Sequence, residues 1–282
     1  WGMHLDFSPD TAGGALFPYL EAMTNQSFGM VLGKGGADTI IKAMTNFIKS
    51  NGGQILFKSE VCEIMHKNSN VSGVRLKDGS IINAKRCIIA NVSPSALLKL
   101  TGKFEDKRYT NALVKFKHAP GTMMIHLSMD NFPNWKASKE LKKFAYVHVA
   151  PSLSQMSKTY QQAIDGILPD RPVIVVGQPT SVDNSRAPSG KHTLWVQVRM
   201  VPGQINGDAA GEIAGNDWSQ IKELYANRVL DILEEYAPKI KQSIITRSVV
   251  SPIDLEKDNP NLVFGDQICG SHHLTQHFIF LS

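Results

Sequence analysis

Apolar residues along the chain follow two different periods, and these periods predict where helices and strands lie. Over 217–237 the apolar positions recur every three or four residues, which is typical of a helix with one buried face. Asp217 stands where an N-cap is expected, and Pro238 ends the pattern. The same period predicts a helix over 37–50, which Asn51-Gly52-Gly53 terminates.

Short apolar runs between turn residues predict strands in two parts of the chain. In the first part, strands are expected at 55–57, 61–65, 71–76, 81–82 and 87–90, with a hairpin turn at Asp78-Gly79. In the second part, a polar helix is expected at 152–167 among strands at 123–127, 144–149, 173–177, 194–198 and 244–250. The fold class is therefore α/β, in the sense of a mixed α+β arrangement with two sheets.

Composition agrees with a folded chain of this kind. The 282 residues are 42% hydrophobic and 20% charged, which is ordinary for a globular protein and allows two compact units. No apolar run approaches the roughly 18 residues that a membrane-spanning helix needs. The chain starts at Trp1 and not at Met, so we expect it to be a piece of a longer protein.

The charge balance excludes a typical nucleic-acid binder. Thirty Lys and Arg against 25 Asp and Glu give a net charge of +5, and the basic residues are scattered. A nucleic-acid partner would require a denser basic stripe. The one basic cluster is interpreted as a solvated helix face; it comprises Lys136, Lys139, Lys142 and Lys143.

The cysteines and histidines indicate neither a disulfide framework nor a metal site. Cys62, Cys87 and Cys269 are odd in number and lack metal-ligand spacing, so a reducing, cytoplasmic compartment is expected. An organellar or membrane-peripheral location stays open if a leader precedes the chain. His272-His273 and His277 have no acidic residue between them as zinc motifs do, so they are interpreted as surface or pocket histidines.

Short motifs bear on two other kinds of chemistry, phosphate binding and hydrolysis. Gly33-Lys34-Gly35-Gly36 before a helix resembles a phosphate cradle, but it fits neither a P-loop nor Gly-x-Gly-x-x-Gly after a strand, which favours a tight turn. A serine hydrolase is disfavoured because no Gly-x-Ser-x-Gly elbow is present. Asp254 and Glu256, two residues apart, would point to opposite sides of a strand, which disfavours paired acid and base work.

The order of several short segments resembles one family, the phytoene dehydrogenase-like flavoproteins, which include carotenoid desaturases and isomerases and are akin to amine oxidases. In the first part these segments are Gly35-Gly36, Asn51-Gly52-Gly53, Val61, Val71-x-Gly73-Val74, Asp78-Gly79 and Ile88-Ile89-Ala90-Asn91. In the second part they are Pro179-Thr180-Ser181 with Asp183, Ala187-Pro188-x-Gly190-x-His192, Ser251-Pro252-x-Asp254-Leu255-Glu256, Asn259-Pro260-Asn261, Gly265-Asp266 and Gln276.

The resemblance implies a domain plan. It assigns 1–29 to the end of a helical substrate region, 30–100 to the middle of a Rossmann-like FAD domain, 101–250 to a mixed-sheet substrate domain, and 251–282 to an incomplete return toward the FAD domain. The family holds FAD with a Gly-x-Gly-x-x-Gly segment and a late Gly-rich motif, and this sequence contains neither. FAD is therefore expected in the complete protein, and little or none on this chain alone.

The resemblance also implies site residues. Val61 and Asn91 match positions where the backbone meets the cofactor. An ordinary role in the core of a strand is an equally good interpretation of Val61. Ser271, His272 and Gln276 are expected to approach the flavin or substrate pocket. No catalytic acid or base is assigned. Three apolar residues at strand spacing could line a pocket but are more often core: Met123, Met124 and Leu127.

The function that the resemblance implies is flavin-dependent oxidation of a C–H bond, or isomerisation of a C=C bond, in an apolar small molecule. The chain by itself is expected to be incomplete and inactive. The alternative is a non-catalytic binding or interaction domain with a degenerate cofactor site. Contact with membranes to collect an apolar substrate stays open. An uncovered sheet edge where a further segment belongs predicts self-association.

Overall fold

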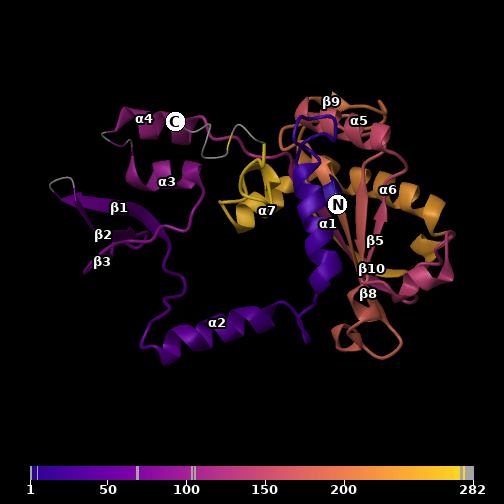
Figure 1. The fold of residues 1–282 in the computed structure, drawn as a ribbon, viewed down its shortest axis with the longest axis horizontal. Helices are drawn as coiled ribbons and strands as arrows, with labels where there is room; N and C mark the ends of the chain where they lie inside the picture. The colour runs from indigo at the N-terminus through magenta and orange to yellow at the C-terminus, as the bar shows by residue number, and fades with distance from the viewer. Residues whose placement is uncertain are drawn as a thin grey trace. The chain divides into compact units, whose positions relative to one another are not determined.

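The computed structural model describes residues 2–4, 6–67, 70–102, 104, 106–273 and 276. The chain divides into two compact units (Figure 1). Unit 1 contains the residues up to Gly36 together with those from His118 onward, and unit 2 contains Ala37–Lys117. The division of 1–29, 30–100, 101–250 and 251–282 between a substrate and a cofactor domain stays a prediction.

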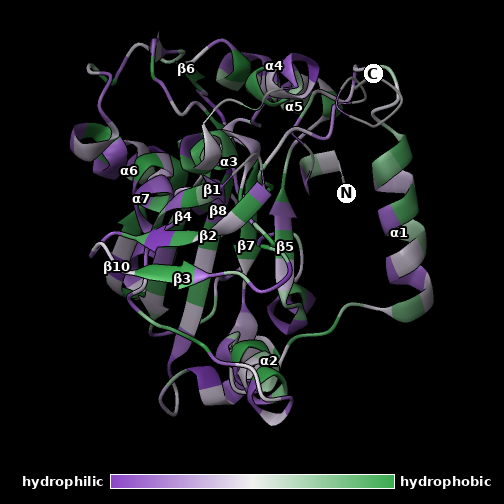
Figure 2. Ribbon diagram, turned by 90° about the vertical axis from the view of Figure 1, so that its left-hand side faces the viewer, coloured by the Kyte–Doolittle hydropathy of each residue, from purple (hydrophilic) through white to green (hydrophobic). Residues whose placement is uncertain are grey.

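Unit 1 is built on a five-stranded antiparallel sheet in the order β10-β4-β8-β7-β5, whose strands lie side by side in Figure 2. Opposite partners place Met123, Val198 and Ile174 in one row across three strands. All three side chains are fully buried, so this row belongs to the core face. The strands are β4 (Gly121–Met129), β5 (Tyr146–Val149), β7 (Ile174–Gly177), β8 (His192–Val201) and β10 (Ile244–Val250).

The core face of the sheet packs against α6 (Trp218–Tyr236), which lies along the sheet in Figure 1. Asp217 caps the helix by accepting a hydrogen bond from the Ser219 amide at 2.8 Å. This confirms the predicted helix and its cap. Leu224, which shares the predicted period, lies at the edge of the buried stripe and is 52% exposed. Met123 and Leu127 are core residues, which is the more frequent role of apolar residues at strand spacing.

The opposite face of the sheet is covered only in part. The predicted polar helix is α5 (Leu153–Ile164), and its buried side, with Met156 and Tyr160, packs on Val173 and Val175. Tyr160 also donates a hydrogen bond at 2.8 Å to the carbonyl of Gly2, in η1 (Gly2–His4). A further helix of unit 1, α1 (Leu16–Phe28), precedes the Gly33–Gly36 turn.

Short helices, turns and strands connect the main strands of unit 1. Asp254 forms a capping box with Ser251 at the start of α7 (Pro252–Asp258), where it also pairs with Lys222 at 2.8 Å. The expectation that Asp254 and Glu256 point to opposite sides of a strand was wrong, because this capping box starts a helix. The remaining elements are η2 (Lys139–Lys143), β6 (Ile167–Leu168), η3 (Pro179–Ser181), η4 (Asn184–Arg186), β9 (Gly207–Asp208), η5 (Ile240–Ser243) and η6 (Val263–Gly265).

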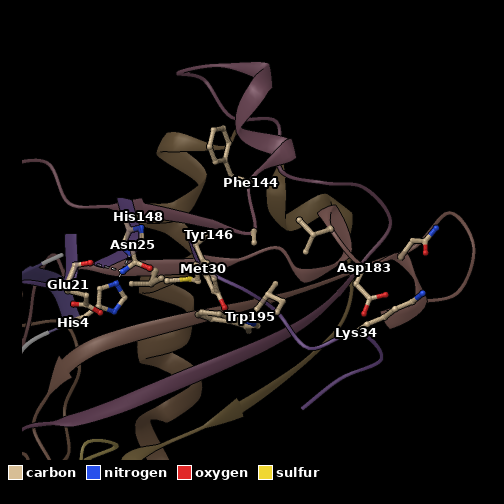
Figure 3. A pocket seen from close by; sticks show the side chains of 15 residues that line it. His4, Glu21, Asn25, Met30, Lys34, Phe144, Tyr146, His148, Asp183 and Trp195 are labelled. Carbon is tan, nitrogen blue, oxygen red and sulfur yellow. Dashed lines mark hydrogen bonds between the residues drawn. The ribbon is translucent and has the colours of Figure 1, made fainter. Parts of the chain in front are cut away.

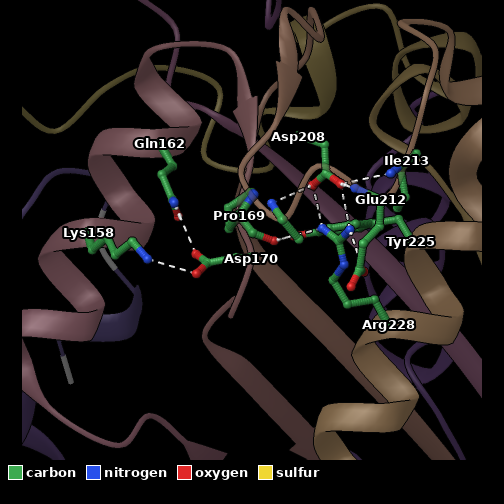
Figure 4. A network of polar contacts seen from close by, with 10 residues as sticks. Lys158, Gln162, Pro169, Asp170, Asp208, Glu212, Ile213, Tyr225 and Arg228 are labelled. Carbon is green, nitrogen blue, oxygen red and sulfur yellow. Dashed lines mark hydrogen bonds and ion pairs between the residues drawn. The ribbon is translucent and has the colours of Figure 1, made fainter.

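A buried ion pair fixes α6 to the turn after β9 (Figure 4). Arg228 donates to both oxygens of the Asp208 carboxylate at 2.5 and 2.6 Å, and the amides of Glu212 and Ile213 donate to the same group at 2.9 Å each. Burial acts to raise the pKa of Asp208, but these hydrogen bonds outweigh it and hold the pKa well below its usual range. The carboxylate is therefore ionised and fully paired.

The described residues of unit 2 form a three-stranded antiparallel sheet and three helices. The Asp78-Gly79 turn joins the second and third strands, which confirms the predicted hairpin. The helix predicted over 37–50 is also present, but its apolar side chains are 40–71% exposed among the described residues. The elements are α2 (Asp38–Ser50), β1 (Val61–Lys67), β2 (Asn70–Leu76), β3 (Ile81–Asn83), α3 (Pro94–Thr101) and α4 (Lys107–Val114).

Two predicted strands of unit 2 are absent from the described residues. The runs 55–57 and 87–90 are extended or bent without a ladder partner, and Ile89 is 89% exposed. A strand exists by pairing with a neighbour, and the described part of the chain offers these runs none. The expectation of strands there was therefore wrong for this chain.

Within the described residues, no helix combines the length and apolar character needed to cross a membrane. The three cysteines are free and exposed. Of the basic cluster, Lys139, Lys142 and Lys143 lie in the short η2 turn, and Lys143 pairs with Glu140 at 2.6 Å.

The buried ion pair yields a stability prediction. Asp208→Asn should lower the free energy of unfolding of unit 1 by about 3–5 kcal/mol, because it leaves the buried Arg228 charge with the exposed Glu212 carboxylate, 3.2 Å away, in place of its buried partner. Asp130→Asn removes an exposed partner of Lys191 and should cost about 1 kcal/mol or less. Urea denaturation followed by circular dichroism measures both. Equal losses in the two variants would contradict the role given to the buried pair.

Candidate functional site

The main candidate site is a cavity of about 1030 Å³ in unit 1, on the face of the sheet that α6 does not cover. Side chains alternate between the two faces along a strand, so Tyr146 and His148 of β5, Val175 of β7 and Trp195 of β8 point to this face and line the cavity. Tyr146, Gly177 and Trp195 lie opposite one another in one row, and His148 lies opposite Val175 in the next. These two rows form the floor of the cavity.

Gly177 lets the two aromatic rings of the floor meet. A Cβ atom at this position would overlap the indole of Trp195, so the ring lies directly over the glycine. The ring centroids of Tyr146 and Trp195 are 5.3 Å apart and tilted by 58°. Such pairs add packing energy beyond the area that they bury. The middle of the cavity is thus an aromatic platform, and Met30 lies beside it in Figure 3. Leu32 and Val182 also line the cavity as apolar walls.

One end of the cavity is polar and is built from α1, η1 and β5. Glu21 and Asn25, four residues apart, lie on one face of α1. His4 and His148 join their Nε2 atoms in a hydrogen bond of 2.9 Å, with ring centroids 5.1 Å apart. Figure 3 shows these four side chains gathered on one side of the aromatic platform. Buried Arg199 supports the end by donating to the His4 carbonyl at 2.9 Å.

Burial makes the two histidines of this end neutral near pH 7. Burial is the main cause that lowers the pKa of His4 to about 4, and the charges of His148 and Arg199 contribute. Burial also lowers the pKa of His148. Two neutral rings can form this hydrogen bond, with one Nε2 as donor and the other as acceptor.

The other end of the cavity is the glycine turn. The Gly35 amide donates to the Asp183 carboxylate at 2.9 Å, and Arg186 donates to the Gly33 carbonyl and to Asp183. Hydrogen bonds from Ser185 and from the Gly35 amide hold the pKa of Asp183 well below its usual range. An amide that already binds a carboxylate cannot also bind a phosphate. The turn interpretation of Gly33–Gly36 therefore fits better than the phosphate cradle.

Three predicted site residues lie close together, but around a residue that sequence reasoning missed. Ser271 donates its hydroxyl to buried Asp6, and the amide of His272 donates to the same carboxylate at 3.0 Å. Gln276 donates to the Ser271 carbonyl at 3.0 Å, and the His272 ring stacks on Phe17 at 5.1 Å. This cluster does not line the cavity described above. Its contact with flavin or substrate stays a prediction.

The remaining predicted residues lie in unit 2. Val61 begins β1 and is half-buried opposite Leu76, while Asn91 is exposed before α3. Their contact with a cofactor stays a prediction. His272 and His273 are described and His277 is not, and no group of three metal-ligating side chains occurs among the described residues.

A complete FAD site does not fit the residues of this chain. Its 282 residues contain no Gly-x-Gly-x-x-Gly segment to receive the pyrophosphate. The Gly33–Gly36 turn, which precedes a helix, would place the Asp183 carboxylate against a bound anion. Unit 2 offers the β1–β2–β3 sheet, and among the described residues it offers no parallel strand and helix of the Rossmann type.

Sequence reasoning missed the cavity residues because they come from distant segments. His4 and His148 are 144 positions apart, and Glu21 belongs to the segment 1–29, for which the sequence predicted a helical region but no individual helix. The signal that could have found part of the site is alternation. In the predicted strands 144–149 and 194–198, Tyr146, His148 and Trp195 interrupt aliphatic runs at every second position.

The histidine pair yields a pH prediction. In the unfolded chain His4 takes up a proton near its ordinary pKa of 6.5, whereas in the folded chain it does so only near 4. The unfolded state therefore binds more protons between these values, and stability falls as the pH drops from about 7.5 to about 5. His4→Gln should make this fall shallower in thermal melts, while His66→Gln, in an exposed position of unit 2, should not. Identical slopes for wild type and His4→Gln would refute the assignment.

Known proteins resemble the chain in sequence. A mouse protein named "Pyridine nucleotide-disulfide oxidoreductase domain-containing protein 2" is 23% identical over 236 residues, covering 79% of this chain and 39% of its own. The 4,4'-diapophytoene desaturase of Methylomonas sp is 26% identical over 264 residues (93% and 47%). The prolycopene isomerase of Daucus carota is 26% identical over 222 residues (77% and 32%). The chain thus spans less than half the length of these relatives.

Structure and family profile agree with these relatives. An oxidoreductase from Methanosarcina mazei has the same fold, with a TM-score of 0.53 at 18% identity over 83% of this chain and 46% of its own. The desaturase and isomerase relatives confirm the predicted resemblance, and the structure confirms the mixed α/β class. The profile described as "Flavin containing amine oxidoreductase" matches residues 2–253. Because this match covers most of the 282 residues, the chain belongs to the flavin-containing amine oxidoreductase family.

Proposed function

We propose that the chain supplies the substrate cavity of a flavin-dependent oxidoreductase that acts on C–H or C=C bonds of an apolar small molecule. The observation that carries the proposal is the aromatic platform of Tyr146 and Trp195 in a cavity of about 1030 Å³. Cavities of this size with apolar walls and few polar groups are typical ligand sites. Relatives named as a desaturase and an isomerase of carotenoids support the substrate class.

The flavin, when bound, supplies the redox chemistry, and this chain supplies binding and orientation of the substrate. The cavity holds the apolar body against the rings of Tyr146 and Trp195 and excludes water from it. We infer that the chain by itself is inactive and binds FAD weakly or not at all, because its residues fit only part of a cofactor site. Val61 and Asn91 of unit 2 are the proposed backbone contacts to FAD.

The absence of a phosphate-binding fingerprint favours a second candidate, a binding domain that holds an apolar ligand without turning it over. Sequencing the transcript on both sides of the present chain separates the two functions. A Gly-x-Gly-x-x-Gly segment upstream and a Gly-rich segment downstream would support the oxidoreductase. A start codon before Trp1 and a stop codon after Ser282 would instead support the binding domain.

The cavity can be tested with Nile red, a neutral apolar dye whose emission rises in apolar surroundings. Trp195→Ala should weaken dye binding about tenfold or more, because a buried aromatic side chain contributes roughly 1.5–3 kcal/mol. Tyr146→Leu should weaken it less. Tyr109→Ala removes an aromatic residue of unit 2 that is 45% exposed and serves as the control. Unchanged binding in Trp195→Ala would sink the assignment of the site.

The FAD inference has its own test. The purified chain mixed with excess FAD and passed through a desalting column should emerge without the visible absorbance of a bound flavin. The physical reason is the missing anion site for the pyrophosphate. A yellow protein with one flavin per chain would overturn the inference.

A further inference from the structure

The polar end of the cavity contains an acceptor that the protein leaves unmatched. The Oε2 atom of Glu21 is shielded from solvent and has no hydrogen-bond partner among the described residues. A buried acceptor without a donor costs free energy. Glu21 lines the cavity, so a ligand donor reaches this oxygen once the Glu21 side chain turns toward the open space.

The neighbours of Glu21 are uncharged hydrogen-bonding groups. Asn25 donates one N–H to the Glu21 carbonyl at 2.8 Å and, as a primary amide, has a second one. The imidazoles of His4 and His148 are neutral near pH 7, since burial lowers the pKa of both. Among the described residues, the charged groups near this end include Glu21 itself and Arg199, which is buried, bound to the His4 carbonyl and attracted by Glu21, Asp6 and Asp266.

We propose that the cavity binds an apolar molecule with an uncharged hydroxyl group at one end, and that this hydroxyl donates to Glu21 while the Asn25 amide and the histidine pair surround its oxygen. The proposal rests on the proposed function, because it concerns the same cavity. It adds that the ligand is amphiphilic and not a pure hydrocarbon. The apolar body lies on the platform of Tyr146 and Trp195.

The chemistry of this end selects among polar groups. A hydroxyl donates one hydrogen bond and accepts others, so it satisfies both Glu21 and its neighbours. An ether of the same length accepts but cannot donate, and it leaves the Glu21 oxygen unmatched. A carboxylate brings a second negative charge against Glu21 in a shielded site, where repulsion is strong. A site built to bind a hydroxyl rejects analogues that lack it.

Three matched probes test the proposal by competing with Nile red at neutral pH: 1-decanol, 1-methoxydecane and decanoate. The alcohol should displace the dye at concentrations about tenfold or more below those of the ether and the acid, the factor that one hydrogen bond to a charged group provides. Glu21→Gln should reduce this preference to about twofold. Glu60→Gln, in an exposed pair of unit 2, should leave it intact and serves as the control.

Each outcome decides the proposal. Preference for the alcohol that depends on Glu21 supports it. Equal competition by all three probes, with dye binding still dependent on Trp195, overturns the hydroxyl site and leaves the apolar cavity of the proposed function standing. Competition by none of them overturns both. If Glu21→Gln fails to fold, Glu21→Asp shortens the side chain, draws the carboxylate away from the hydroxyl and should reduce the preference in its place.

Discussion

The alternation of side chains across the five-stranded sheet is the constraint on which the rest of unit 1 depends. Because α6 takes one face, the residues at every second position of β5, β7 and β8 must be aliphatic. The positions between them face away from that core, and Val175 among them is buried under α5. Tyr146, His148 and Trp195 occupy these positions, so the same register that closes the core also aligns the floor of the cavity.

The elements of this sheet could be predicted from sequence because their information is local. The strands at 123–127, 173–177, 194–198 and 244–250 follow from short apolar runs, and α6 follows from its period and its Asp217 cap. The prediction of strands at 55–57 and 87–90 was wrong for a physical reason. A strand needs a partner, and no window of sequence reveals whether the partner lies in the same chain.

The candidate site could be predicted far less well than the fold. Ser271, His272 and Gln276 lie close together, but their contact with flavin or substrate stays a prediction, and the buried carboxylate that binds the first two, Asp6, is 265 residues away from Ser271. The contact between His4 and His148 is equally distant in sequence. Such pairs are decided by how segments pack, and a single sequence without its relatives holds no record of that packing.

The position of η1 makes the N-terminal segment a tethered wall of the cavity. Gly2–His4 is held by hydrogen bonds from Tyr160 and Arg199, and the exposed pair Ala12-Gly13 lies between η1 and α1. While the chain is intact, the tether keeps η1 at a high effective concentration beside β5. A protease cut at Ala12-Gly13 would leave η1, with whatever precedes it, held beside β5 by non-covalent contacts alone. Retention of a ligand would then depend on the dilution of the sample, as it does in a two-component complex.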